Sequence, residues 1–280
     1  MTRDRRLTPA TARIALRELQ GEIDRPAYTN GQPARLGVAV ADLLRAPDGP
    51  RDRQINFGAD LTVIDQDDGY SFVKAALDGY CGWVRSAALV AQDHAITHRL
   101  IAPASHIYPA PDMKQREIGW LSLGARVSVA ETTTRFAQLA TGGWVPLMHL
   151  ATEPASDPAA VAEGLIGTPY LWGGNSRAGI DCSGLAQAAL AACAIPCPGD
   201  SDLQEAAFPA VSDIRRNDLL FWRGHVALAL SETHMIHATA HVMAVTVEPI
   251  AEALARIEAR GDSAFLGIRR PPAAGGTAFP

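Results

Sequence analysis

The stretch "YLWGGNSRAGIDCSGLAQAAL", residues 170–190, places Cys182 between a glycine-rich approach and an alanine-rich run. Asp181 is a favourable N-cap residue, so the pattern predicts a helix that carries Cys182 in its first turn. One face of this helix has an apolar stripe made of Leu185, Ala188, Ala189 and Ala192. Unpaired backbone N–H groups and the positive end of the helix dipole favour a thiolate at such a position. The stretch therefore predicts a nucleophilic cysteine, whereas Cys193 at the far end of the helix is predicted to pack.

The cysteine pattern gives little support to a disulfide framework or a metal site. The chain has four cysteines, Cys81, Cys182, Cys193 and Cys197. Structural zinc sites usually combine two close pairs of ligands, and only Cys193 and Cys197 are close in the sequence. We therefore expect neither a metal nor an organic cofactor.

A nucleophilic thiol needs a base, and the base needs a partner that orients it. The sequence predicts strands at 218–222, 225–230 and 235–238, with His225 opening the second strand and His237 in the third. If the last two strands form a hairpin, their even separation allows His225 and His237 to lie on one face. The sequence leaves the register open, and a histidine that begins a buried strand can equally be a core residue.

These motifs resemble the NlpC/P60 cysteine peptidases over about residues 155–270, through "PYLWGG", "DCSGL", "DLLFW", "HVALAL" and "IHA". The resemblance implies an α+β, papain-like domain in which a cysteine-bearing helix packs against an antiparallel sheet. It also implies that Cys182 is the nucleophile and that His225 is the general base and acid. By the same resemblance, His237 orients His225, and Tyr170 supports the oxyanion.

The first half of the chain contains an internal repeat. Three short segments occur twice, in the same order. "APD" begins at Ala46 and again at Ala110, "GADLTV" at Gly58 is matched by "GARVSV" at Gly124, and "GWV" begins at Gly82 and again at Gly143. Period-2 apolar runs broken by Gly, Asp and Pro favour small β-barrels over helical repeats. The two copies resemble bacterial SH3-like (SH3b) domains, and we expect Trp83 and Trp144 to belong to the barrel cores.

The resulting domain organisation has five parts. Thr8 followed by Pro9 predicts the start of a short helix that runs to about Gly21. The predicted parts are an N-terminal helix and lead-in (1–34), a first SH3b domain (35–95), a second SH3b domain (96–153), the NlpC/P60 catalytic domain (154–270) and a flexible tail (271–280).

Two SH3b domains before the catalytic domain resemble the γ-D-glutamyl-L-diamino acid endopeptidases of this family. That resemblance implies a murein peptide substrate with a free N-terminal L-Ala, cut between γ-D-Glu and the diamino acid. Asp200 and Ser201 in "GDSDLQ" match the residues that receive the substrate ammonium group, although the same segment also fits a helix N-cap. Tyr80 matches a substrate-contacting tyrosine of the first SH3b domain, and Trp172 is expected to line the cleft.

Some details of substrate recognition stay open in the sequence. The resemblance implies an acidic residue from the first SH3b domain, for which Asp42 and Asp48 are both candidates. The diamino acid is not fixed by any motif.

Composition disfavours several other partners. The chain has 280 residues, 48% of them apolar and 20% charged, with a formal net charge of −5. This balance argues against nucleic acid and anionic membranes as partners, and no apolar run is long enough to span a bilayer. The N-terminus lacks the apolar region of a signal peptide, which favours a cytoplasmic enzyme of cell-wall peptide recycling. We expect this enzyme to be a monomer.

Three alternative functions are compatible with these observations. One is an amidase or acyltransferase on the same fold. Another is a non-catalytic cell-wall-binding protein that uses its SH3b domains. The third is a secreted wall hydrolase whose signal is absent from this sequence.

Overall fold

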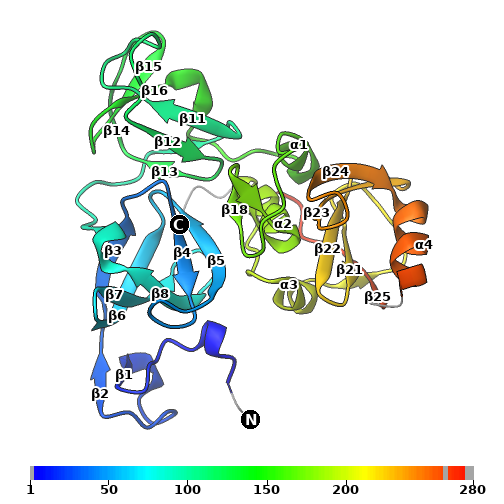
Figure 1. The fold of residues 1–280 in the computed structure, drawn as a ribbon, viewed down its shortest axis with the longest axis horizontal. Coiled ribbons are helices and arrows are strands. Elements are labelled where there is room, and N and C mark those ends of the chain that lie inside the picture. The colour runs from blue at the N-terminus through cyan, green and yellow to red at the C-terminus, as the bar shows by residue number, and fades with distance from the viewer. Residues whose placement is uncertain (1–2, 261–263, 275–280) are drawn as a thin grey trace. The chain divides into compact units, whose positions relative to one another are not determined.

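The structure is a computed structural model, and it describes residues 3–260 and 264–274. The chain divides into two compact units (Figure 1). The first comprises Met1–Leu100 and Ala104–Leu150, and the second comprises Ile101–Pro103 and Ala151–Pro280. Each unit has its own sheets and its own buried core.

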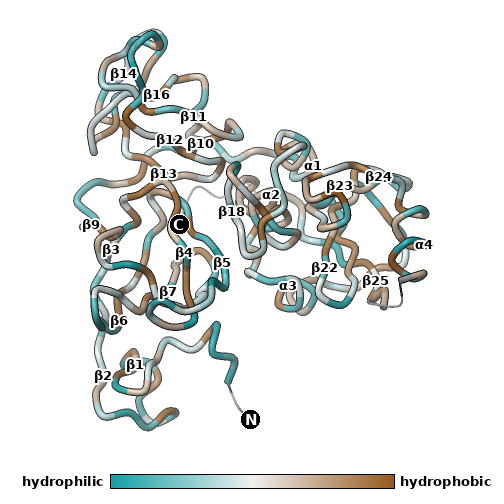
Figure 2. Tube along the Cα trace, in the orientation of Figure 1, coloured by the Kyte–Doolittle hydropathy of each residue, from teal (hydrophilic) through white to brown (hydrophobic). Residues whose placement is uncertain are grey.

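The N-terminal segment is not the helix that the sequence predicts. It contains the short 3₁₀ turns η1 (Arg5–Leu7) and η2 (Arg17–Leu19) and the parallel strands β1 (Ile14–Leu16) and β2 (Ala27–Thr29). Leu16 is buried in a cluster with Ile64 and Phe72. Packing against these barrel residues therefore overrides the local Thr-Pro helix signal. The residues around η1 are mainly hydrophilic (Figure 2).

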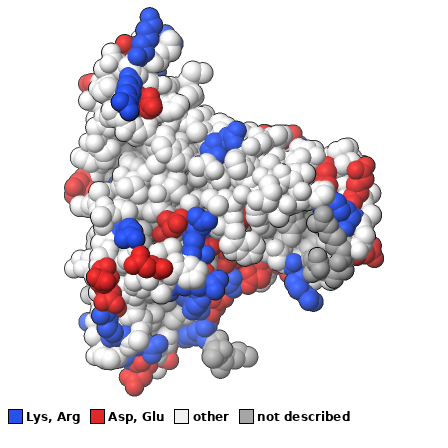
Figure 3. Space-filling view, viewed as in Figure 1, with Lys and Arg blue, Asp and Glu red and all other residues white. Residues whose placement is uncertain are grey.

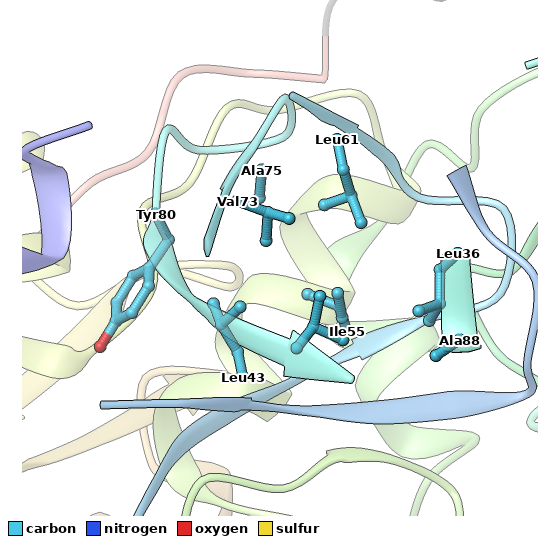
Figure 4. Packing of buried hydrophobic residues seen from close by; sticks show 9 residues of the cluster. Leu36, Leu43, Ile55, Leu61, Val73, Ala75, Tyr80 and Ala88 are labelled. Atoms are coloured by element: carbon cyan, nitrogen blue, oxygen red, sulfur yellow. The ribbon is translucent and has the colours of Figure 1, made fainter. Parts of the chain in front are cut away.

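The next part of the first unit is a strongly twisted seven-stranded sheet. Its strands are β3 (Gln32–Leu36), β4 (Val40–Leu44), β5 (Arg51–Asn56), β6 (Asp60–Asp67), β7 (Tyr70–Ala75), β8 (Cys81–Arg85) and β9 (Leu89–Val90). They pair in the order β5-β4-β8-β7-β6-β3-β9. Leu36, Leu43, Leu61 and Val73 form the centre of its core (Figure 4).

The remaining part of this unit is built from three small sheets. Their strands are β10 (His98–Leu100), β11 (Ala104–Ile107), β12 (Gly119–Ser122), β13 (Arg126–Val127), β14 (Val129–Thr132), β15 (Phe136–Leu139), β16 (Trp144–Pro146) and β17 (Leu150–Ala151). They pair as β13-β10-β17, β11-β12 and β14-β15-β16. The core of this part contains Leu100, Leu121, Ala137 and Val145.

The two copies of the sequence repeat adopt matching local structures. Each Gly-Trp-Val segment enters a strand, β8 or β16, that is followed by a 3₁₀ turn (η3, Ser86–Ala88, or η4, Leu147–His149) and a short strand. The prediction that Trp83 and Trp144 are core residues is wrong, because both are only partly buried while Val84 and Val145 are 0% exposed. Successive side chains of a strand face opposite sides, so the valine that follows each tryptophan occupies the core.

The second unit contains a six-stranded antiparallel sheet. Its strands are β20 (Ala210–Val211), β21 (Leu219–Trp222), β22 (His225–Ala229), β23 (His234–Thr239), β24 (Ala244–Pro249) and β25 (Phe265–Arg269), in the order β20-β25-β21-β22-β23-β24. A separate hairpin joins β18 (Asn175–Ser176) to β19 (Gly179–Ile180). The helices are α1 (Pro158–Glu163), α2 (Cys182–Ala192), α3 (Ser201–Ala207) and α4 (Ile250–Arg260).

Helices cover this sheet in the arrangement expected of an α+β domain. Helix α2 packs against β22 and β23. Ile250 and Ala253 of α4 are buried with Leu220, Trp222 and Met235 of the sheet. Helix α1 ends at Glu163, with Gly164 as its C-cap residue.

Two further expectations concern the surface and the C-terminus. On the face drawn in Figure 3, Lys and Arg side chains are interspersed with Asp and Glu. Within the described ranges, no helix combines the length and apolarity that a transmembrane span requires. The predicted tail at 271–280 falls mostly outside the described residues, which end at 274, and Pro271 is buried.

Candidate active site

Asp181 fixes the start of α2 and joins it to the glycine-rich loop. One of its carboxylate oxygens accepts hydrogen bonds from the Gly184 N–H at 2.7 Å and the Ser183 hydroxyl at 3.0 Å. The other oxygen accepts the Gly173 N–H at 2.8 Å. The predicted N-cap is therefore confirmed, and the same carboxylate holds the preceding loop against the helix.

The loop requires glycine at two of these positions. Gly173 has a φ of 70°, in the left-handed region that glycine adopts without strain. A Cβ atom on Gly184 would lie 2.4 Å from the Gly174 carbonyl oxygen. This distance is too short for a side chain at position 184 unless the backbone moves. The "WGG" and "DCSG" motifs thus pack against each other through their backbones.

Cys182 is the first residue of α2 and is 7% exposed. Burial, together with the negative charge of Asp181, raises the pKa of the Cys182 thiol to about 12. Backbone N–H groups, including that of Val226, act in the opposite direction. The expectation of a stabilised thiolate is therefore wrong for the free protein, because desolvation outweighs the helix terminus. The resting sulfur is a neutral thiol.

The other cysteines are also shielded from solvent. All four cysteines are buried thiols, and Cys193 is 0% exposed, as its predicted packing role requires. Over residues 3–260 and 264–274, no three or more His, Cys, Asp and Glu side chains are grouped as ligands for a metal ion.

The two histidines meet as the hairpin hypothesis predicts. Strands β22 and β23 are antiparallel, with Leu228 opposite Ile236. This register makes His225 and His237 diagonal neighbours on one face of the sheet. His225 Nε2 lies 2.8 Å from His237 Nδ1. The pairing leaves the Nδ1 atom of His225 on the opposite side of its ring.

The surroundings of the histidine pair keep both rings neutral. The Trp222 ring packs at 5.7 Å from the His225 ring, between centroids. Burial, followed by the charges of His237 and Arg256, lowers the pKa of His225 to about 3. Burial also lowers the pKa of His237 to about 4. Because Val226, whose N–H acts on the thiol, directly follows His225, strand β22 links the base to the cysteine.

Tyr170 lies where its hydroxyl is sensitive to the charge of the cysteine. Its backbone N–H donates to the Met243 carbonyl at 2.9 Å, and it forms a parallel bridge with Ile180 just before the helix. Burial raises the pKa of Tyr170 above its usual range, and the neighbouring Cys182 and Asp181 groups, when ionised, act in the same direction. The phenol therefore keeps its proton and is available as a hydrogen-bond donor.

Asp200 and Ser201 lie at the start of α3, where Asp200 is the N-cap residue and its carbonyl accepts the Gln204 N–H at 3.1 Å. Its side chain makes no capping hydrogen bond, and its φ of 62° with ψ of 140° is strained for a residue other than glycine. The segment is therefore a helix N-terminus, as the alternative interpretation predicts, but the Asp200 carboxylate does not cap it. Trp172 is 67% exposed, so its ring presents a large apolar surface to solvent.

Tyr80 belongs to the first unit and is 1% exposed. Its ring lies at the edge of the core cluster, with the hydroxyl pointing away from the other side chains (Figure 4). The Arg53 guanidinium lies 5.0 Å from the ring centroid and pairs with Asp78 at 2.7 Å. The sequence did not reveal this buried ion pair, because strand register decides which charges meet.

The two acidic candidates of the first unit are both engaged in ion pairs. Asp42 contacts Arg51 at 3.2 Å, and Asp48 contacts Arg85 at 3.0 Å. Asp48 also accepts a hydrogen bond from the Tyr70 hydroxyl.

Sequence reasoning also missed Glu248. A carboxylate oxygen of this residue lies 2.7 Å from His237 Nε2, and the same oxygen contacts Arg256. Glu248 is on β24, which pairs with β23. The alternation of side chains along "VTVEP" predicts which residues share a face of the strand with Glu248. Only the register of β23 and β24 shows that His237 lies on the same face.

Comparisons with known proteins agree with this architecture. The sequence profile of the NlpC/P60 family matches residues 167–259, and that of the bacterial dipeptidyl-peptidase Sh3 domain matches residues 43–89. Dipeptidyl-peptidase 6 of Lysinibacillus sphaericus is 31% identical over 219 residues, which cover 66% of this chain and 79% of the relative. Gamma-D-glutamyl-L-lysine dipeptidyl-peptidase of Bacillus subtilis (strain 168) is 28% identical over 57% of this chain and 60% of its own length. The crystal structure of an NlpC/P60 family protein from Bacillus cereus ATCC 10987 superposes with a TM-score of 0.74 at 22% identity, covering 85% of this chain and 99% of that one.

Proposed function

Because the chain belongs to the NlpC/P60 family of cysteine peptidases, we propose that it hydrolyses the γ-D-glutamyl–diamino acid bond of murein peptides. The observation that carries the proposal is the placement of Cys182 at the start of α2, on the strand side where His225 pairs with His237. The choice of this bond is supported by relatives named as dipeptidyl-peptidases, one of which is named for γ-D-glutamyl-L-lysine. An intact set of a thiol and two imidazoles disfavours a purely wall-binding role.

In the proposed reaction, attack and proton transfer occur together. The thiol and the imidazole are both neutral at rest, so the Cys182 proton passes to His225 Nδ1 as the sulfur attacks the γ-glutamyl carbonyl. The backbone N–H of Cys182 and the Tyr170 hydroxyl donate hydrogen bonds to the oxyanion. His225 then protonates the leaving amine of the diamino acid.

Hydrolysis of the thioester completes the cycle. His225, neutral again, accepts a proton from water as the water oxygen attacks the thioester carbonyl. Collapse of the second tetrahedral intermediate releases the γ-carboxylate of L-Ala-γ-D-Glu and returns the proton to the Cys182 sulfur. His237 keeps the His225 ring in place through both steps.

Asp200 and Ser201 are proposed to bind the ammonium group of the N-terminal L-alanine. The strained backbone of Asp200, whose carboxylate makes no capping hydrogen bond, supports this role, since backbone strain is typical of functional positions. The exposed Trp172 ring offers an apolar wall for the peptide. Tyr80 is a prediction from resemblance alone.

The proposed physiological role is recycling of small murein peptides in the cytoplasm by a monomeric enzyme. It rests on the preference for a free amine, because small peptides released from the wall carry such ends. An amidase or acyltransferase on the same fold would act on a different bond.

Product analysis by mass spectrometry tests the proposal. We expect L-Ala-γ-D-Glu-diaminopimelate to yield free diaminopimelate and L-Ala-γ-D-Glu, and N-acetylation of the alanine to lower kcat/KM at least tenfold. His225→Ala should abolish turnover, whereas His234→Ala, which changes an exposed histidine on the neighbouring strand, should not. Equal turnover of free and acetylated peptides would reject the ammonium site, and cleavage at another bond would reject the proposed substrate.

A further inference from the structure

We propose that Glu248 is a positioning residue that selects the catalytic tautomers of His237 and His225. The proposal rests on the roles assigned to the two histidines under the proposed function. It extends the series of interacting side chains from Cys182 through His225 and His237 to the carboxylate of Glu248.

The register of β23 and β24 brings the carboxylate to the histidine pair. His237 is opposite Thr246, and Met235 is opposite Glu248, so Glu248 and His237 are diagonal neighbours on one face. The His237 side chain is fully buried, whereas that of Glu248 is 18% exposed. Glu248 Oε1 lies 2.7 Å from His237 Nε2, a close contact that does not meet the angular limit of a hydrogen bond.

This contact determines which nitrogen of His237 carries its proton. A lone pair on Nε2 would repel a carboxylate oxygen at 2.7 Å, so Nε2 carries the hydrogen. His237 Nδ1 is then an acceptor, and at 2.8 Å it receives the Nε2–H of His225. The proton-free atom of His225 is consequently Nδ1, the nitrogen that the proposed mechanism needs as the base for the thiol.

Arg256 and His241 are the other charged or titratable groups that act on this pair of histidines. Arg256 donates to Glu248 from the facing helix α4, and its charge disfavours protonation of both histidines. His241, beyond the end of β23, also disfavours a charged His237. Glu248 is the group that favours a positive charge on His225, and that charge develops as the thiol is deprotonated.

Nitrogen-15 NMR of the histidine side chains tests the tautomers without substrate. In Cys182→Ala protein at pH 7, we expect both His225 and His237 as Nε2–H tautomers. In the same background, Glu248→Gln should convert a measurable fraction to the Nδ1–H form, because the amide can donate to His237 Nε2. Nδ1–H tautomers in the Glu248-containing protein, or identical spectra for both proteins, would overturn the proposal.

Steady-state kinetics on the otherwise native chain provide the second readout. Glu248→Gln should lower kcat roughly tenfold to a hundredfold, by analogy with the loss of carboxylates that orient histidine ligands in metal sites, with KM changed less than twofold. Glu248→Asp should recover part of this loss. Glu258→Gln, at an exposed position of α4, is the matched control and should leave kcat unchanged.

An unchanged kcat for Glu248→Gln would overturn the positioning role. Because the NMR measurement needs no turnover, a wrong substrate assignment would leave the tautomer result standing. Conversely, if the tautomers assigned to His237 and His225 were wrong, the assignment of the protein as a peptidase would still stand.

Discussion

At the scale of single residues, the decisive balance is between desolvation and the helix N-terminus at Cys182. The helix terminus alone predicts a thiolate, and its N–H groups do act in that direction. Cys182 is only 7% exposed, however, and burial next to Asp181 raises the thiol pKa to about 12. Both shifts favour the uncharged forms of the Cys182 thiol and the His225 imidazole in the free enzyme.

Alkylation kinetics will show this neutral state. The rate of Cys182 modification by iodoacetamide should rise about tenfold per pH unit from pH 6 to pH 10, because the thiolate fraction does so below a pKa of about 12. Peptide mapping identifies the modified residue, and Cys182→Ser is the control. A plateau of the rate below pH 8 would contradict the prediction.

Tyr170 provides a second prediction at this scale. Tyr170→Phe removes one proposed oxyanion donor and keeps the ring, so we expect kcat to fall by ~10²-fold with little change in KM. Tyr108→Phe, in a strand-flanking position of the first unit, is the control. A loss confined to KM would instead assign Tyr170 to ground-state binding.

At the scale of elements, the start of α2 explains why the local sequence pattern was informative. Asp181 caps the helix and anchors the loop before it, and both partners are close in the sequence. The histidine hairpin was likewise predicted from period and spacing. Features that depend on register, such as the Glu248 contact and the inward-facing Val84 in place of Trp83, could not be predicted in the same way.

The N-terminal segment shows the opposite limit of local reasoning. Thr8 and Pro9 form a valid helix start, yet Ile14–Leu16 forms a strand that pairs with Ala27–Thr29. Burial of Leu16 against the barrel stabilises this strand, and a residue 48 positions away in the sequence, Ile64, supplies the contact. A prediction made from the N-terminal residues alone therefore cannot include this contact.

Two helix caps allow a matched comparison of stability and activity. Asp181→Ala and Asp157→Ala each remove a capping carboxylate, of α2 and of α1, and each should lower the free energy of unfolding by about 1 kcal/mol. Only Asp181→Ala should also reduce kcat, because only this carboxylate holds the loop beside the nucleophile. Chemical denaturation and steady-state assays measure the two effects. Equal activity of the two variants would contradict the assigned role of Asp181.

At the scale of the whole molecule, the two buried histidines couple stability to pH. Their folded-state pKa values of about 3 and about 4 lie below the ordinary histidine value of 6.5. Between these values the unfolded chain binds more protons than the folded chain, so their contribution to stability is present above about pH 6.5 and is lost as the pH falls toward 3.

Denaturation at several pH values will test this coupling. The free energy of unfolding should fall more steeply between pH 6.5 and pH 4 for the native sequence than for a His225→Gln/His237→Gln variant, because the variant lacks both buried bases. The comparison removes the contribution of carboxylates, which both proteins share. Equal slopes would show that the rings are not held neutral in the folded protein.

The central claim is that Cys182 performs the cleavage of the γ-D-glutamyl bond. Its most direct test is the release of free diaminopimelate from L-Ala-γ-D-Glu-diaminopimelate by the full chain and by Cys182→Ala, followed by mass spectrometry. We predict rapid release of diaminopimelate by the native sequence and none above background by the variant. Comparable release by both proteins would contradict the account.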